Sequence, residues 1–422
     1  MLRIEPGEAV PFDVFVRPND MVLWGQAAAE PMSLISSLMD QRSHLGGIRC
    51  FIGITRSTAV TEACTDHVDF FSFTGGHGAA RSLAQSGNLQ IFPIPYSAVP
   101  ELVSSGPARA DVVMLQLART DDPDQFSISG AQDYLVAALR SARVVIGELN
   151  VAAPLTHGSR EVSAEDIDVL VEVSRPATDV PSSQPSDVDV TIARLIADRI
   201  EDESTLQIGI GRIPDAVLAR LSGHRDLGVH SGLIGDAVAD LMESGVITNR
   251  RKGRDEGCSV SAFLSGGRRV LDFADRNPAI QLRPIEYVYD PVVLASIHRF
   301  VAINSALEVD LTGQVNAEVA AGSYLGTVGG AGDFLRAAKR SPGGTPIIAL
   351  PSTVAAKSRI VTRLSGPVST TRSDSGVIVT EFGVADLRAI PLRDRPAHMI
   401  AIAHPDHREQ LAREVRDLPQ FY

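Results

Sequence analysis

The chain has 422 residues, more than a single hydrophobic core usually supports, so we expect two domains. Asp and Glu number 51 against 39 Lys and Arg, and the formal net charge of −12 argues against nucleic acid and anionic membranes as partners. With 44% hydrophobic and 21% charged residues, the composition is typical of a globular protein and excludes a disordered or fibrous one.

The cysteines and the N-terminus indicate the compartment. Cys50, Cys64 and Cys258 are far apart and form no CxxC pair, so we expect neither a disulfide framework nor a cysteine metal site, and we expect no metal. Met1–Val10 lacks the apolar stretch of a signal peptide, and no segment approaches the roughly 18 apolar residues of a membrane span. The sequence therefore predicts a cytoplasmic protein.

Strand-like and helical segments alternate along the first part of the chain. In chain order we expect a strand at Met21–Gly25, a helix at Glu30–Asp40, strands at Ile48–Ile54 and Val112–Leu117, a helix at Gln132–Ser141 and a strand at Val144–Leu149. This alternation favours βαβ units on a mainly parallel sheet, that is, the α/β class. Such sheets bind ligands at the carboxyl ends of their strands.

A segment rich in proline and serine, Ser174–Val188, resembles a linker. We place the domain boundary near residue 185, which gives an N-terminal domain of residues 1–185 and a C-terminal domain of residues 186–422. The second domain is expected to begin with a helix at Val190–Ile200, a strand at Leu206–Ile210 and a helix at Pro214–Leu221.

Two glycine-rich segments precede predicted helices. Gly209 and Gly211 lie between a strand and a helix, and Gly329, Gly330 and Gly332 precede a helix that carries basic residues. Backbone N–H groups in such loops can approach an anionic or extended ligand closely. A simple structural turn is the alternative in both places.

Two further groups of residues could take part in acid–base chemistry. His230, Ser231 and Gly232 are predicted to end a strand before a helix at Asp236–Met242, and His230 could serve as a base or be a satisfied structural residue. Glu308 and Asp310 alternate as in a strand, so their carboxylates share a face. They could form a buried carboxylate pair or lie on a solvated edge.

The ordered series of motifs resembles the acetyl-CoA hydrolase/transferase family, which includes 4-hydroxybutyrate, butyryl and itaconate CoA-transferases. The resemblance runs from about Met21 to the C-terminus. Its motifs are GGHGAA, ELNVAAPLTHG, TLQIGIGRIPDAVL, INSALEVDLTGQVNAE, GTVGGAGDF, IIALPST, VIVTEFGVADLR and AHPDHREQL.

The resemblance implies two similar open α/β domains with the active site between them, in a homodimer or a higher homo-oligomer. It implies an acyl-CoA and a small carboxylic acid as partners, with coenzyme A as substrate. In such enzymes a glutamate attacks the thioester, forms an acyl-glutamyl anhydride and then a glutamyl-CoA thioester. For CoA binding, the matching residues are Gly209, Gly211, Gly329, Gly330, Gly332, Asp333, Phe334 and Lys357.

The chain departs from the family pattern at the nucleophile. The family glutamate follows a His/Thr or Tyr/Thr pair, and the matching residues here are His230, Ser231 and Gly232, so Gly232 stands at the glutamate position. Asp236 and the following family residues are kept. A second departure is Ala331, where many relatives carry glutamine. We expect the missing side chain to enlarge the pocket and to favour a bulkier or branched acyl chain.

Three interpretations remain open. In the first, the chain is a CoA-transferase that uses another carboxylate, such as Glu308 or Glu30, or in which the acceptor acid attacks directly in a ternary complex. In the second, a water at Gly232, activated by His230, Asp236 or Glu308, makes the chain an acyl-CoA hydrolase. In the third, the chain binds acyl-CoA without turnover. In each case, backbone N–H groups near the two glycine-rich loops would stabilise an oxyanion.

Overall fold

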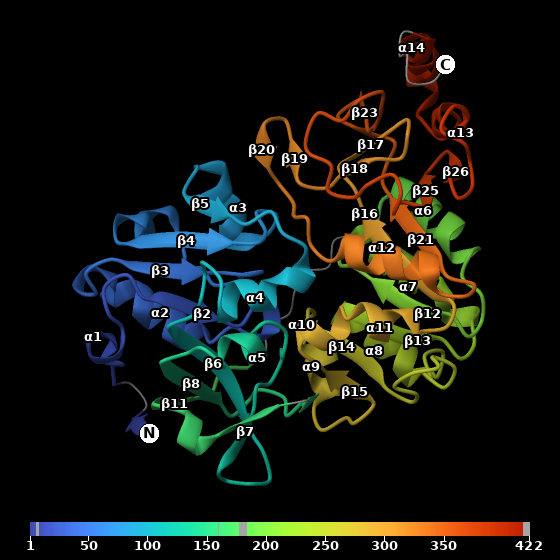
Figure 1. Cartoon of the computed structure of the whole chain (residues 1–422). Coiled ribbons are helices and arrows are strands. Elements are labelled where there is room, and N and C mark those ends of the chain that lie inside the picture. Colours follow the sequence, from blue (N-terminus) through green and yellow to red (C-terminus); the bar gives the residue numbers. More distant parts are fainter. Residues whose placement is uncertain (6–7, 159, 177–183, 417–422) are drawn as a thin grey trace.

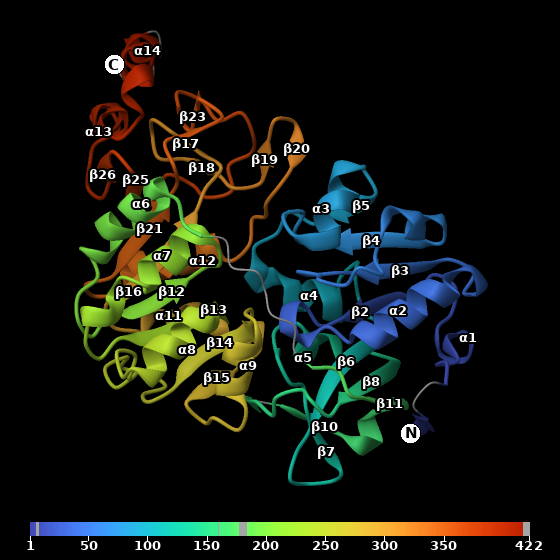
Figure 2. The same cartoon turned by 180° about the vertical axis from the view of Figure 1, so that it is seen from behind.

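The computed structural model describes residues 1–5, 8–158, 160–176 and 184–416. Two open, mainly parallel sheets lie beside each other, one in each half of the chain, and helices cover both faces of each sheet (Figure 1). Figure 2 shows the same arrangement from behind. The predicted α/β class is confirmed. Within the described residues, no helix has the length and apolar character needed to span a membrane.

The first sheet has ten strands in the described part of the chain, with a fully parallel main path. Its path is β1 (Leu2–Ile4), β11 (Val169–Val173), β8 (Val144–Asn150), β6 (Val112–Arg119), β2 (Met21–Trp24), β3 (Ile48–Phe51), β4 (Val68–Ser72) and β5 (Leu89–Ile91), with β7 (Gln125–Ser127) and β10 (Glu161–Ser163) paired off it. The helices of this half are α1 (Phe12–Phe15), α2 (Met32–Gln41), α3 (Gly78–Gln85), α4 (Val99–Ser104) and α5 (Leu135–Ala138). All four residues of β2 are buried, as in a sheet covered on both faces.

Across the described residues the second sheet has nine strands, and its last strand comes from the N-terminal half. Its order is β26 (Gly383–Asp386), β25 (Val377–Thr380), β21 (Thr345–Ala349), β16 (Phe300–Ser305), β12 (Thr205–Ile208), β13 (Gly228–Ile234), β14 (Ser259–Leu264), β15 (Ile280–Leu282) and β9 (His157–Gly158). The helices of this half are α6 (Asp187–Ala197), α7 (Arg212–Leu218), α8 (Asp236–Glu243), α9 (Arg268–Ala274), α10 (Ile285–Val288), α11 (Pro291–Ala295), α12 (Ala331–Arg340), α13 (Arg395–Ala401) and α14 (Pro405–Arg416). Three small sheets complete it: β17 (Glu308–Asp310) with β18 (Val315–Asn316) and β24 (Ile360–Val361), the hairpin β19 (Val319–Ala320) with β20 (Ser323–Tyr324), and the hairpin β22 (Thr353–Val354) with β23 (Lys357–Ser358).

A buried core is shared by the two halves. Leu135 of α5, Val288 of α10 and Phe334 of α12 belong to one hydrophobic cluster. Main-chain hydrogen bonds cross the same boundary: the Gln132 N–H donates to the Ala262 carbonyl at 3.0 Å, and the Tyr96 N–H donates to the Gly329 carbonyl at 2.9 Å. Because burial and backbone bonds both cross the boundary, the relative position of the halves is set by the fold itself.

Several bounds of the predicted elements were wrong; the helix expected at Gln132–Ser141, for example, spans only Leu135–Ala138. The strand expected to end at Gly232 continues to Ile234, because Leu233 and Ile234 still pair with Phe263 and Leu264 of β14. The linker expected to reach Val188 ends earlier, because a capping box between Ser186 and Asp189 starts α6 at Asp187. Residues 177–183 of this predicted linker lie outside the described part of the chain.

Candidate active site between the two halves

A pocket of about 270 Å³ opens where both sheets present the carboxyl ends of their strands. In the second sheet, the strand order reverses at β12 and β16, and the pocket contains Gly209 after β12 and Ser305 at the end of β16. In the first sheet the reversal lies at β2, and Gln26 follows that strand into the same pocket. Ligands of open α/β sheets bind at such reversal points.

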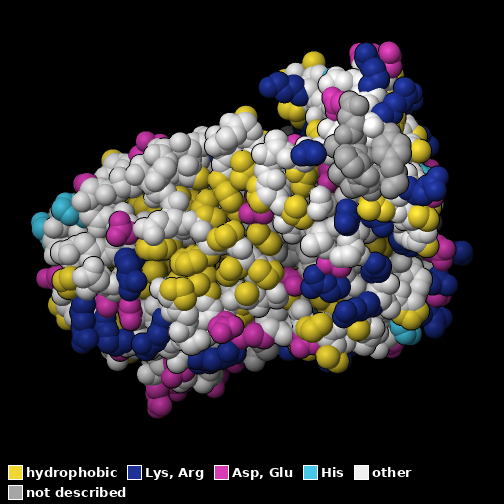
Figure 3. All heavy atoms as spheres, turned by 45° about the horizontal axis from the view of Figure 1, so that its top comes forward, with side chains coloured by type: hydrophobic (Ala, Val, Ile, Leu, Met, Phe, Trp, Pro, Cys, Tyr) yellow, Lys and Arg dark blue, Asp and Glu magenta, His cyan; other side chains and the backbone are white. Residues whose placement is uncertain are grey.

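The pocket lining is mainly apolar and carries no Asp, Glu, Lys or Arg among the described residues. The N-terminal half contributes Gln26, Ile54, Phe73, Thr74, His77 and Tyr96, and the C-terminal half contributes Phe263, Tyr289, Phe334, the residues around Gly209 and the loop Gly326–Ala331, among others. Hydrophobic side chains gather across the middle of the face shown in Figure 3. This composition suits an uncharged group.

Aromatic rings from both halves form one wall of the pocket. The ring of Tyr289 packs against Phe334, with centroids 4.5 Å apart, and against Tyr96, at 5.3 Å. Gln26 fixes Tyr96: its amide nitrogen donates to the Tyr96 hydroxyl at 2.6 Å and to the Asp133 carboxylate at 2.9 Å. The wall is therefore held by ring packing across the boundary and by hydrogen bonds within the N-terminal half.

Gly232 lines this pocket, and Tyr289 occupies the space beside it. A Cβ atom built on Gly232 would lie well inside the van der Waals distance of the Tyr289 hydroxyl oxygen. The enlarged space that the sequence predicted at Gly232 is therefore absent, because a tyrosine from another element fills it. That Gly232 stands where relatives carry glutamate remains a prediction.

His230 lies on the same face of β13 as Gly232 but does not line the pocket. Its ring is fully buried, and its Nε2 lies 2.9 Å from the Val288 carbonyl at the end of α10. Burial, together with the nearby Lys252, lowers the pKa of the imidazole to about 3. This neutral ring has the surroundings of a structural residue.

Asp236 and Glu308 also lie outside the pocket lining. The Asp236 carboxylate accepts from the Gly267 N–H at 3.0 Å and from the Val270 N–H at 2.9 Å, so it caps the start of α9. Glu308 accepts from the Asn316 amide at 2.9 Å and from the Ser365 N–H. The carboxylate pair considered for Glu308 and Asp310 does not form a joint site, because Asp310 accepts from Thr312 and Gln314 instead.

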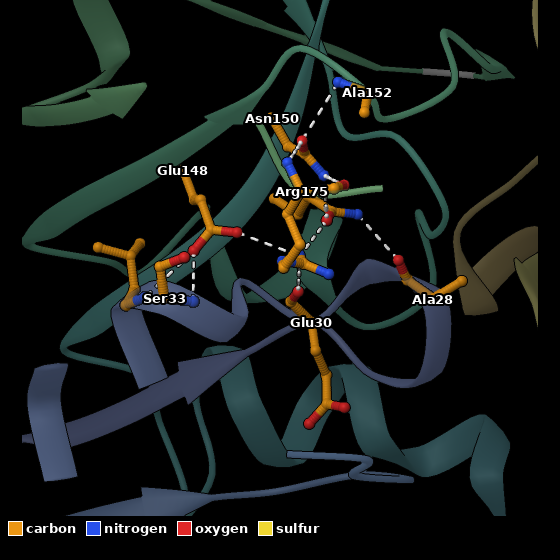
Figure 4. A network of polar contacts seen from close by, with 9 residues as sticks. Ala28, Glu30, Ser33, Glu148, Asn150, Ala152 and Arg175 are labelled. Atoms are coloured by element: carbon orange, nitrogen blue, oxygen red, sulfur yellow. Dashed lines mark hydrogen bonds and ion pairs between the residues drawn. The ribbon is translucent and has the colours of Figure 1, made fainter. Parts of the chain in front are cut away.

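Glu30 borders a separate cavity of about 40 Å³ that also contains Arg56 and Arg175. Figure 4 shows that only the Glu30 carbonyl faces the Arg175 guanidinium, which lies 3.1 Å from that oxygen and 3.1 Å from Glu148. The Glu30 carboxyl group points away and accepts from Thr55 and from the Arg56 N–H. Its burial raises its pKa to about 7.

The residues predicted to bind CoA fall into three groups. Gly209, Gly329, Gly330 and Phe334 line the pocket, while Gly211 lines an adjoining cavity of about 300 Å³ that shares Ile210, Ser305 and Ala317 with it. Asp333 accepts from the Ser97 hydroxyl at 3.0 Å, and burial raises the pKa of its carboxyl group. Gly332 lies in the first turn of α12 and Lys357 is exposed on β23, and neither lines these cavities.

Sequence reasoning did not single out Tyr289, Tyr96 or Gln26 as site residues. Tyr289 follows a short helix in an ordinary sequence context, and nothing there signals that its hydroxyl reaches β13. His77, which lies in the motif GGHGAA, also lines the pocket, where desolvation lowers the pKa of its imidazole. The described residues contain no cluster of His, Cys, Asp and Glu that could hold a metal ion.

Comparisons with known proteins agree with this architecture. The family model for the acetyl-CoA hydrolase/transferase C-terminal domain matches residues 266–415. A 4-hydroxybutyrate coenzyme A transferase of Clostridium kluyveri is 35% identical over 407 residues, which cover 95% of each chain. The crystal structure of RipA from Yersinia pestis is similar with a TM-score of 0.92 at 31% identity, covering 99% of this chain and 97% of RipA. The crystal structure of 4-hydroxybutyrate CoA-transferase from Porphyromonas gingivalis is similar with a TM-score of 0.79 at 33% identity, covering 96% of this chain and 95% of the transferase chain.

The two α/β halves and the pocket at their reversal points define an enzyme of the acyl-CoA class. The chain belongs to the acetyl-CoA hydrolase/transferase family.

The contact between Gly232 and Tyr289 predicts a stability difference between two glycine variants. Gly232→Ala should lower the free energy of unfolding by about 1–3 kcal/mol, because the added methyl group overlaps the Tyr289 hydroxyl. Gly223→Ala is the control, since nothing lies within 4 Å of a Cβ at that position. Urea unfolding of both variants measures the difference, and equal stabilities would contradict the contact.

Glu30 predicts a pH dependence of stability. Its folded pKa of about 7 lies above its ordinary value of 4.5, so its protonated form favours the folded state, and this contribution is lost as the pH rises through about 7. Between pH 5 and pH 8 the loss should amount to about 2 kcal/mol, and Glu30→Gln should remove it. Unfolding curves at both pH values measure the loss. Glu165→Gln, on an exposed residue, should leave the dependence unchanged, and an unchanged dependence in Glu30→Gln would refute the assignment.

Proposed function

We propose that the chain transfers CoA between an acyl-CoA and a small carboxylic acid, with the acceptor acid attacking the thioester directly in a ternary complex. The observation that carries this proposal is the pocket lining: Gly232 opens onto a pocket at the strand ends of both halves, and no carboxylate lines it among the described residues. The name of the Clostridium kluyveri relative, a CoA transferase, supports the reaction class.

The reaction then needs no covalent bond to the protein. A carboxylate oxygen of the acceptor attacks the thioester carbonyl carbon, the carbon–sulfur bond breaks, and CoA leaves as a thiolate with a mixed anhydride left behind. The thiolate attacks the acceptor's carbonyl carbon in this anhydride, the carbon–oxygen bond breaks, and the original acyl group leaves as a carboxylate. Thioester and anhydride are both activated acyl groups, so each step exchanges one for the other.

The two adjoining cavities suggest how an acyl-CoA would lie. We propose that the acyl group enters the apolar pocket and that the pantetheine chain follows the cavity beside Gly211, which also carries Arg212 and Arg359. Arg212, which is half exposed and pairs with Asp189 of the same cavity at 3.4 Å, suits a phosphate of CoA, whereas Arg359 already donates to the Leu307 carbonyl. Backbone N–H groups in the first turn of α12, which begins beside Gly330, are available to stabilise an oxyanion.

Several finer points belong to the same proposal. We propose a cytoplasmic homo-oligomer that uses coenzyme A as substrate and needs no metal, with its domain boundary near residue 185. Among the described residues the pocket offers no carboxylate to replace a family glutamate, so the proposed reaction does not pass through Glu30, Glu308 or Asp236.

A two-substrate assay tests the reaction. With butyryl-CoA and acetate, we expect acetyl-CoA to form only when acetate is present, and initial-rate plots to intersect, since both substrates bind before chemistry. Free-thiol titration and separation of the thioesters measure both. Parallel plots with an enzyme-bound CoA thioester would contradict the direct attack. Thiol release without acetate would indicate a hydrolase, and binding without either product a non-catalytic protein.

The apolar lining predicts a preference for uncharged acyl groups. Butyryl-CoA should be used with a kcat/KM at least about tenfold above that of succinyl-CoA, because a succinyl carboxylate would enter the pocket without a cation to pair with. Steady-state kinetics with the two thioesters and one acceptor give the ratio. A ratio near one, or a preference for succinyl-CoA, would show that the acyl group binds elsewhere.

A further inference from the structure

Tyr289 presents a polar group to a pocket that is otherwise largely apolar. It directly follows α10, and its ring lies between Tyr96 from the N-terminal half and Phe334 of α12. Tyr289 lines the pocket, and its hydroxyl forms no hydrogen bond with any residue in the described ranges. Although Tyr289 as a whole is only 7% exposed, its hydroxyl oxygen is open to the pocket, so a ligand or a water can meet it there.

Two glycines make room for this side chain. A Cβ on Gly330 would overlap the Tyr289 ring at Cε1, and a Cβ on Gly232 would overlap its hydroxyl oxygen. Gly330 has a φ of −92°, and Gly232 is not among the glycines with positive φ, so the backbone demands glycine at neither place. The absence of side chains at these positions is therefore explained by Tyr289 itself.

The hydroxyl thus lies where a side chain at position 232 would enter the pocket. Its surroundings keep it protonated: burial, and to a lesser extent the nearby Asp333 and Asp133, raise the pKa of the phenol well above its usual value. A protonated phenol donates a hydrogen bond and is a poor nucleophile at neutral pH. Its chemical role differs from that of a carboxylate.

We propose that Tyr289 is a catalytic residue whose hydroxyl donates a hydrogen bond to the thioester carbonyl oxygen of the bound acyl-CoA, at the place from which a carboxylate nucleophile would otherwise attack. This inference rests on the proposed function. When the acceptor carboxylate adds to the carbonyl carbon, negative charge develops on that oxygen and the Tyr289 hydrogen bond strengthens. The proton stays on Tyr289, and the CoA thiolate leaves with the electron pair of the carbon–sulfur bond.

Tyr289→Phe removes only the hydroxyl and keeps the ring. We expect kcat to fall about 100-fold, the size of effect that follows the loss of one oxyanion donor, with little change in KM for the acyl-CoA. The matched control is Tyr287→Phe on the neighbouring turn of chain: the Tyr287 hydroxyl bonds to Asp255 at 2.8 Å and lies outside the pocket lining. Its kcat should stay within about twofold of wild type. An active Tyr289→Phe with unchanged kcat would overturn the proposal.

A double-mutant cycle tests the geometry independently of turnover. Gly232→Ala should be less destabilising when combined with Tyr289→Phe than in the wild-type background, because the overlapping oxygen is gone. Additive changes in the free energy of unfolding would show that the hydroxyl does not lie beside Gly232, and so would contradict the proposal.

A replacement experiment distinguishes the hydrogen-bond donor Tyr289 from a carboxylate nucleophile at position 232. A glutamate side chain introduced at Gly232 needs the space of the Tyr289 hydroxyl. Gly232→Glu alone should therefore be inactive, whereas Gly232→Glu combined with Tyr289→Ala should form an enzyme-bound acyl or CoA adduct detectable by mass spectrometry of the intact protein. An adduct in Gly232→Glu alone would overturn the steric argument. A failure of the proposed function would give a different result. The wild-type chain would then turn over no acyl-CoA at all, while the free energies of unfolding in the double-mutant cycle would still be non-additive.

Discussion

The Tyr289 hydroxyl occupies the space that any side chain at position 232 would need. The site depends on this steric constraint. It links β13, which carries Gly232, to the residue that follows α10, and Gly330 at the start of α12 must also be small to admit the same ring. Three elements of the C-terminal half are thereby fitted around one side chain. Tyr96 extends the contact to the N-terminal half, so the position of the hydroxyl depends on how the halves pack.

The packing of the halves also sets the electrostatic character of the pocket. The core that they share surrounds it with aromatic and aliphatic groups, and no charged residue lines it among those described. In such a medium a single oriented donor has more effect on a developing oxyanion than it would in water. The charged residues considered as alternatives serve the fold instead: Asp236 caps α9, and Glu308 ties together loops near β18.

Much of the fold could be predicted from the sequence because its parallel strands are buried on both faces and appear as short apolar runs. β2, β6 and β8 begin where the runs Met21–Gly25, Val112–Leu117 and Val144–Leu149 begin. Strand ends that depend on pairing with another strand could not be predicted. The last residues of β13, for example, are held by β14 rather than by any local preference.

The site was only partly predictable for a related reason. Glycines before predicted helices were informative, since Gly209, Gly329 and Gly330 all line the pocket. Carboxylates and His230 were not, because a titratable residue in sequence gives no sign of the hydrogen bonds that will satisfy it. Tyr289 could not be found, since its role arises from a contact with a residue 57 positions earlier in the chain.

The direct measurement of the central claim is a crystal structure of the wild-type chain with a non-hydrolysable analogue of butyryl-CoA. The account predicts that the carbonyl oxygen of the analogue lies at hydrogen-bond distance, about 2.7 Å, from the Tyr289 hydroxyl, with the acyl chain against Phe334. A carbonyl oxygen that faces Glu30 or Glu308, or an acyl chain outside the pocket, would contradict it.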